Sequence, residues 1–255
     1  MSDEFYIGWE RKAAPAIGKA IRKVAALILL VALVAPVVLA VSQRMIGVSM
    51  FEWGNHKNFA GILELHPYPH LLVPRPGETG GAAQFSTYYL VSQWKFGLDQ
   101  AALASLDGKP VRLKGTLIYR GNQTMIETLA DWIQADAKFP AAPPVPQPIS
   151  LGRQTLTGEI VDSKCFLGVM NPGQLITHRA CAIRCISGGI PPVLLVRATN
   201  GPAVYFLLVS SDGRAVNQEV LDLVAEPVQI TGEVVRQGEL LILRADPATY
   251  HRAAR

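Results

Sequence analysis

Three cysteines and one histidine gather in a single stretch of the chain, with the spacing C-x12-H-x2-C-x3-C. They are Cys165, His178, Cys181 and Cys185, and the chain contains no other cysteine. Thiolate sulfur and imidazole nitrogen are preferred ligands of zinc and copper, and Cys3His is a common tetrahedral zinc set. The spacing therefore predicts a site for zinc or copper that uses these four residues.

A short helix would bring three of these residues together. Thr177 is a suitable helix N-cap residue, and two glycines follow the last cysteine, which predicts a helix over 178–186. His178, Cys181 and Cys185 then occupy positions i, i+3 and i+7 and share one face. The remaining cysteine would approach that face from the end of the preceding strand.

The same cysteines permit different chemistry, because cysteines of exported proteins are usually paired. A bridge from Cys165 to Cys181 or Cys185 would close a loop of about 15–20 residues and stabilise the fold by roughly 3 kcal/mol. The third cysteine would remain a free thiol beside His178, which could lower its pKa. A redox-active thiol pair is a further alternative. The spacing leaves the metal site, the disulfide and the redox pair open.

This stretch resembles an uncharacterised family of exported bacterial domains. The resemblance covers residues 156–210 and rests on the motif C-x12-H-x2-C-A-x2-C-x2-G-G-x-P, which begins at Cys165 and ends at Pro191. It implies that the three cysteines and His178 act together, and it implies no particular reaction.

The N-terminal part of the chain predicts export and membrane attachment. Residues 24–41 form a run of eighteen residues without charge, close to the length that spans a bilayer. Lysines and arginines are concentrated before it, which predicts a cytoplasmic basic tail over 1–23, a transmembrane helix over 24–43 and a bulk in the bacterial periplasm. A signal peptide cleaved after Ala40 is the alternative, but the length of the apolar run favours an uncleaved signal-anchor.

Two further domains follow, and the second repeats the pattern of the first. Residues 44–137 and 151–255 each read as strand, helix, strand, turn and strand, and a proline-rich linker over 138–150 separates them. Gly115 of the first domain aligns with Gly232 of the second. The pattern predicts a mainly β fold with two tandem OB-like barrels, the second carrying a helical Cys/His insertion, with a β-sandwich as the alternative.

Local signals refine these two domains. We expect one helix in each, over 98–106 and 216–224, and we expect the prolines at 67, 69, 74 and 76 to prevent regular strand pairing between them.

A second resemblance concerns architecture. A helix with a cytoplasmic N-terminus followed by a periplasmic OB barrel is similar to the haem chaperones of cytochrome c maturation. Members of that family carry His-x-x-x-Tyr in the C-terminal tail. This chain ends in Tyr250-His251-Arg252-Ala253-Ala254-Arg255, so it departs from that motif, and haem carriage does not follow.

Composition and motifs favour a binding role over catalysis. The net charge of +4 comes without a basic stripe with interleaved aromatic residues, which argues against nucleic acid. Nucleotide-binding, hydrolase and metalloprotease motifs are absent from the sequence. The sequence therefore predicts a single-pass, periplasm-facing accessory or binding protein that contacts the bilayer through 24–43 and belongs to a membrane redox or assembly complex. The alternatives are a thiol-redox protein or metallochaperone, and a peptide- or glycan-binding module with structural cysteines.

Overall fold

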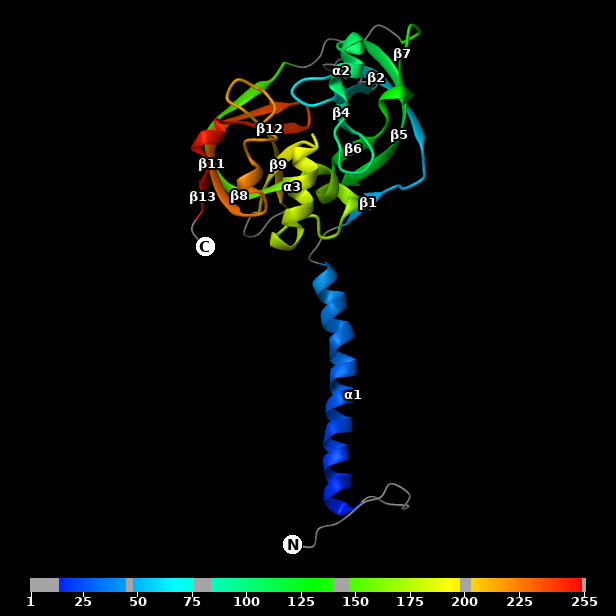
Figure 1. The fold of residues 1–255 in the computed structure, drawn as a ribbon, viewed down its shortest axis with the longest axis vertical. Coiled ribbons are helices and arrows are strands. Elements are labelled where there is room, and N and C mark those ends of the chain that lie inside the picture. The colour runs from blue at the N-terminus through cyan, green and yellow to red at the C-terminus, as the bar shows by residue number, and fades with distance from the viewer. Residues whose placement is uncertain (1–13, 45–47, 76–83, 140–146, 198–202, 254–255) are drawn as a thin grey trace. The chain divides into compact units, whose positions relative to one another are not determined.

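The computed structural model describes residues 14–44, 48–75, 84–139, 147–197 and 203–253, and the chain divides into two compact units, 1–47 and 48–255. The first unit contains α1 (Pro15–Arg44, Figure 1). Its segment Pro15–Ser42 has a mean hydropathy of 3.1, so it is long and apolar enough to cross a membrane. Its apolar side chains are exposed, as those of a helix facing lipid would be.

The first barrel is closed by five strands in the order β5-β2-β3-β4-β6 and back to β5. All neighbouring strands in it are antiparallel except β4 and β6, which are parallel. Short strands β1 and β7 pair along β5, and a helical turn precedes β5. The elements are β1 (Ser49–Phe51), β2 (Lys57–Glu64), β3 (His70–Arg75), β4 (Gln84–Val91), α2 (Gln100–Leu103), η1 (Ala104–Leu106), β5 (Pro110–Arg120), β6 (Gln123–Glu127), η2 (Ala130–Trp132) and β7 (Ile133–Ala135).

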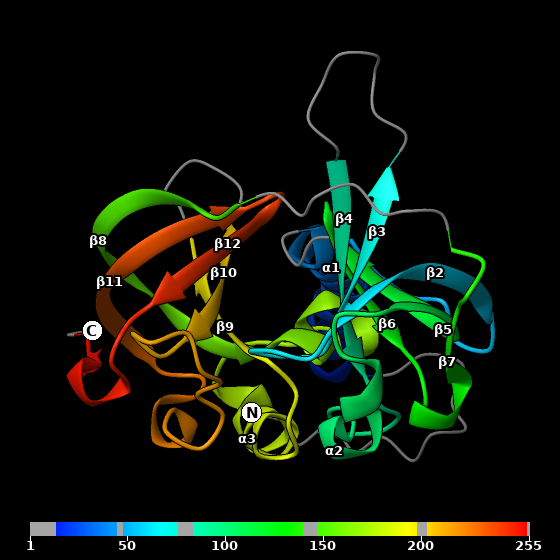
Figure 2. The same ribbon diagram turned by 90° about the horizontal axis from the view of Figure 1, so that it is seen from above.

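The second barrel closes in the same way, β11-β8-β9-β10-β12 and back to β11, and its third and fifth strands are again parallel. Figure 2 shows the two barrels beside one another. The prediction of a mainly β fold is confirmed. The elements are β8 (Ile149–Asp162), η3 (Cys165–Val169), η4 (Ile176–His178), α3 (Arg179–Ser187), β9 (Pro192–Val196), β10 (Val204–Val209), η5 (Leu221–Leu223), β11 (Pro227–Gln237), β12 (Leu240–Arg244), η6 (Pro247–Thr249) and β13 (His251–Arg252).

The two glycines that mark the sequence repeat have the same structural reason. Gly115 lies within β5 and Gly232 within β11, and each strand is eleven residues long. A β-carbon on Gly115 would meet the carbonyl oxygen of Glu127 at 2.8 Å, and one on Gly232 would meet the carbonyl of Arg244. Both glycines therefore let the long strand pass close to the last strand of its barrel.

Two local expectations were wrong, and a third falls mostly on residues that the structure does not describe. The proline-rich stretch contains β3, which pairs with β4 on one side through Arg75 but with β2 only up to Leu72, so Pro74 interrupts no bond to β2. The expected helix over 216–224 is only the turn η5, because its β-branched valines have low helix propensity and are held in the core of the second barrel. Most of the predicted linker and tail falls on 140–146 and 1–13, which lie outside the described residues.

A shared core joins the two barrels. One buried apolar cluster contains Tyr89, Ile118 and Met125 from the first barrel together with Val193 and Leu207 from the second. The hydroxyl of Tyr68 donates to the carbonyl of Leu208 at 3.1 Å and accepts from the amide of Val216 at 3.0 Å. The same cluster contains Cys165, Phe166 and Leu167, so the segment 163–191, which connects β8 to β9, packs against the first barrel.

Candidate functional site

The connection between β8 and β9 brings the predicted residues together. The sulfur atoms of Cys165 and Cys181 and a ring nitrogen of His178 all lie within 4.8 Å of one another. The sulfur of Cys185 lies 3.9 Å from that of Cys165. The three cysteines are free thiols in the structure. The geometry thus brings Cys165, His178 and Cys181 together as one possible ligand group. Cys165 and Cys185 form a second such group with Asp162, and the use of either group for a metal ion remains a prediction.

Three short helical elements place these donors. Cys165 begins the turn η3 shortly after the end of β8, His178 ends the turn η4, and Cys181 and Cys185 lie on α3. Thr177 is not the N-cap of this helix, because the 3-10 turn Ile176–His178 runs directly into α3 and His178 takes the N-cap position without a side-chain bond. The helix ends at Gly188, as the glycines predicted.

Asp162, which is fully buried, is a fifth member of the site, and the sequence pattern did not indicate it. One carboxylate oxygen accepts from Nε2 of His178 at 2.9 Å, and the other accepts from the amide of Cys165 at 2.8 Å. With the carboxylate ionised and the imidazole neutral, Nε2 would carry the proton and Nδ1 would keep its lone pair. The available signal was its position three residues before Cys165, where an aspartate can bond the amide of a following turn.

The three thiols have different environments. Cys165 and Cys185 are buried, whereas Cys181 is partly exposed. The hydrogen bond with Cys185, burial and the nearby Asp162 carboxylate raise the pKa of the Cys165 thiol. Nζ of Lys95 lies 2.6 Å from the sulfur of Cys181, and this hydrogen bond raises the pKa of the lysine. Lys95 follows β4, so the first barrel contributes a cation to the site.

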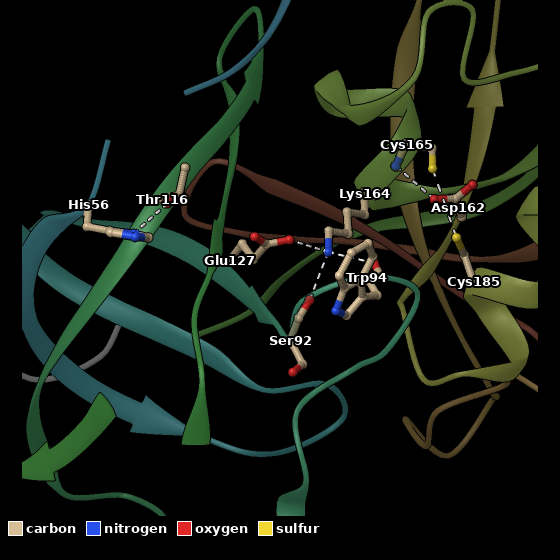
Figure 3. Close-up of polar contacts among 9 residues, drawn as sticks. All are labelled: His56, Ser92, Trp94, Thr116, Glu127, Asp162, Lys164, Cys165 and Cys185. Carbon is tan, nitrogen blue, oxygen red and sulfur yellow. Dashed lines mark hydrogen bonds and ion pairs between the residues drawn. The ribbon is translucent and has the colours of Figure 1, made fainter. Parts of the chain in front are cut away.

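A buried ion pair lies directly beside the cysteines (Figure 3). Nζ of Lys164 contacts Oε2 of Glu127 at 2.5 Å and donates to the carbonyls of Ser92 and Trp94 at 2.8 and 2.7 Å. A charge inside a protein needs such partners, because its desolvation costs several kcal/mol. Since Lys164 immediately precedes Cys165, this pair fixes the start of η3 against the first barrel.

The loop 92–97 of the first barrel completes one wall of the site. Besides the carbonyls that hold Lys164, its Gly97 amide donates to the carbonyl of Gly188 at 2.9 Å. The carbonyl of Lys95 also packs where a β-carbon of Gly188 would lie. The end of α3 and this loop are therefore in close backbone contact.

The site thus consists of three thiols, one imidazole oriented by a carboxylate, and a lysine from the neighbouring barrel. No protein-family model and no curated protein matches this chain.

Proposed function

We propose that this protein is a membrane-anchored accessory or binding protein whose second barrel holds one zinc or copper ion. Cys165, His178, Cys181 and Cys185 are the ligands. One observation carries the proposal: Cys165 belongs to two groups of closely spaced donors, one with His178 and Cys181 and one with Asp162 and Cys185, and Asp162 also bonds a ring nitrogen of His178. A carboxylate behind a ligating histidine is a regular feature of protein metal sites.

The donor set also favours binding over catalysis. Three thiolates and one imidazole suit zinc or copper, and four protein ligands complete a tetrahedral set. A catalytic zinc site keeps one position for water or substrate, which a closed set of four does not provide. A structural or carrier role for the ion follows.

The barrels themselves support an OB-type assignment. Each barrel joins its third strand to its fifth in parallel and its fourth to its first, and the first barrel carries a helical turn between strands three and four. In the first barrel, β2 and β3 are joined by residues 65–69, whereas 163–191 join β8 to β9. We therefore regard the Cys/His segment as an insertion into the second barrel.

The N-terminal helix supports the proposed location. With the apolar run of α1 as an uncleaved anchor and the basic residues before that run in the cytoplasm, the barrels would lie in the periplasm of a bacterial inner membrane. A periplasmic metal or thiol site on such an anchor suits a subunit of a membrane redox or assembly complex, whose partner would be another membrane protein.

Metal analysis tests the site. The full chain is purified in mild detergent under reducing, chelator-free conditions, and its metals are quantified. We expect about one zinc or copper ion per chain, since one tetrahedral donor set is present. His178→Ala should lose the ion, whereas His251→Ala, which changes an exposed histidine of β13, should keep it. A metal-free wild type that also fails to take up added zinc or copper contradicts the proposal.

Gentle extraction tests the accessory role. A complex should survive in mild detergents, so we expect stoichiometric membrane partners to co-purify with the tagged full chain and to be lost in a denaturing detergent. A lone monomer in every mild detergent would contradict membership of a stable complex while leaving the metal assay unaffected.

A further inference from the structure

We propose that, without a metal ion, the three cysteines form a thiol relay that reduces a disulfide. Cys181 is its entry, Cys165 its middle and Cys185 its end. The substrate class is a small or protein disulfide, and the inference rests on the positions of the sulfur atoms rather than on metal binding.

Exposure identifies the entry. Only 3% of Cys165 and 1% of Cys185 is accessible, while Cys181 is partly exposed. A thiolate must approach the sulfur of an external disulfide directly, so access limits the first step. Lys95, whose ammonium lies 2.6 Å from the Cys181 sulfur, would stabilise the attacking thiolate.

Distances identify the middle member. The Cys165 sulfur lies within 4.8 Å of that of Cys181 and 3.9 Å from that of Cys185. Residues four apart on a helix have β-carbons about 5–6 Å apart. A disulfide requires a distance of about 3.5–4.5 Å between the two β-carbons, so Cys181 and Cys185 pair poorly with each other. Cys165, which faces the helix from η3, is the one thiol that can pair with either.

The relay has three exchanges. The Cys181 thiolate attacks the disulfide, forms a mixed disulfide and releases the first leaving group as a thiolate. Cys165 gives its proton to that thiolate, attacks the Cys181 sulfur and expels the second leaving group as a thiolate. Cys185 gives its proton to this second thiolate and attacks the Cys165 sulfur, and Cys181 leaves as a thiolate. In total, Cys165 and Cys185 give up two protons and two electrons, and one disulfide becomes two thiols.

After the third exchange, the new disulfide joins the two buried sulfurs, and the accessible Cys181 thiol is free again. Oxidised chains would therefore still react with an alkylating reagent at Cys181. They would also lack two of the four proposed metal ligands, so oxidation and metal binding would exclude each other.

A time course with glutathione disulfide tests the relay. The reduced, chelator-treated full chain in detergent is exposed to this probe, quenched with acid and alkylating reagent, and mapped by peptide mass. We expect a transient glutathione adduct on Cys181, followed by its loss and by a Cys165–Cys185 bridge with a mass loss of two hydrogens. A first adduct on a buried cysteine, or a stable Cys181 adduct in the wild type, would overturn the proposal.

Variants locate each exchange. Cys165→Ser should retain the adduct on Cys181, and Cys185→Ser should stop at a Cys165–Cys181 bridge. Lys95→Met should slow adduct formation, whereas Lys109→Met, which changes an exposed lysine, should not. The order in which the adduct and the bridge form is measured in the wild type. The test therefore remains decisive even where a variant misfolds. If the metal analysis finds one ion per chain but the relay fails, only the relay is rejected. If the relay works in a chain that binds no metal, only the metal proposal is rejected.

Discussion

At the scale of single residues, Asp162 fixes the positions of two donor residues relative to each other. It is fully buried and bonds both His178 and the amide of Cys165. Under the proposed function, Asp162→Asn should lower zinc affinity by about 10–100-fold, the usual cost of removing such a partner. Competition with a chromophoric chelator measures this. Asp212→Asn, at an exposed aspartate outside the site, should leave the affinity unchanged. Equal affinities for wild type and Asp162→Asn would contradict the assigned role.

The Lys164–Glu127 pair gives a prediction that is independent of metal. Both side chains are buried, so Glu127→Gln leaves a buried ammonium without its counter-charge. We expect a loss of about 3–5 kcal/mol in the free energy of unfolding. Urea unfolding of the full chain in detergent measures it. Glu239→Gln, which breaks the half-exposed pair with Arg75, should cost no more than about 1 kcal/mol. Similar losses in the free energy of unfolding for the two variants would show that the buried pair contributes no more stability than the half-exposed pair.

At the scale of elements, the contact between the loop 92–97 and the end of α3 determines where the cysteines face. Gly188 has φ −81°, which alanine also adopts, so Gly188→Ala acts only through its new β-carbon. That carbon would collide with the carbonyl of Lys95. We expect a loss of about 1–3 kcal/mol, as for other overpacked sites, and faster alkylation of Cys181. Ser187→Ala, one residue earlier, serves as the control, and unchanged stability and alkylation in Gly188→Ala would contradict the contact.

The elements also show how far sequence reasoning reaches. Alternation along β11 and the matching glycines of β5 and β11 are local signals, and they predicted the repeated strands. The i, i+3, i+7 spacing is local too, and it predicted that the α3 residues would approach Cys165.

The parts that the sequence did not predict depend on distant residues. Lys95 and Cys181 are 86 residues apart, and Lys164 and Ser92 are 72 apart. No local period links such pairs, so they appear only when the barrels pack together. The β3 pairing was missed for a related reason, because a proline blocks a strand only where its amide is needed.

At the scale of the whole molecule, the two barrels should unfold together. The shared apolar cluster and the Tyr68 hydroxyl link them, and that hydroxyl has two buried backbone partners. Tyr68→Phe leaves both partners unsatisfied and should cost about 1–3 kcal/mol. Tryptophan fluorescence and circular dichroism should report the same single unfolding transition for the wild type and for Tyr68→Phe. Tyr119→Phe, at a half-buried position of β5, is the matched control. Two separate transitions in the wild type would contradict a common core.

The proposed membrane location of the protein depends on α1 alone. A charged residue at the centre of a spanning helix costs about 2.5–3.5 kcal/mol on insertion scales, so two such residues should abolish insertion. The double variant Val31→Arg/Val34→Arg should therefore move from the membrane pellet to the alkaline-soluble fraction. Ser42→Arg, at the end of the apolar segment, should stay in the pellet, because a long side chain there reaches the interface. If the double variant resists alkaline extraction as the wild type does, membrane attachment would have to come from the barrels or from a partner. The intact mass of the membrane-bound wild type then separates the anchor from a cleaved signal peptide, since only an anchor retains residues 1–40.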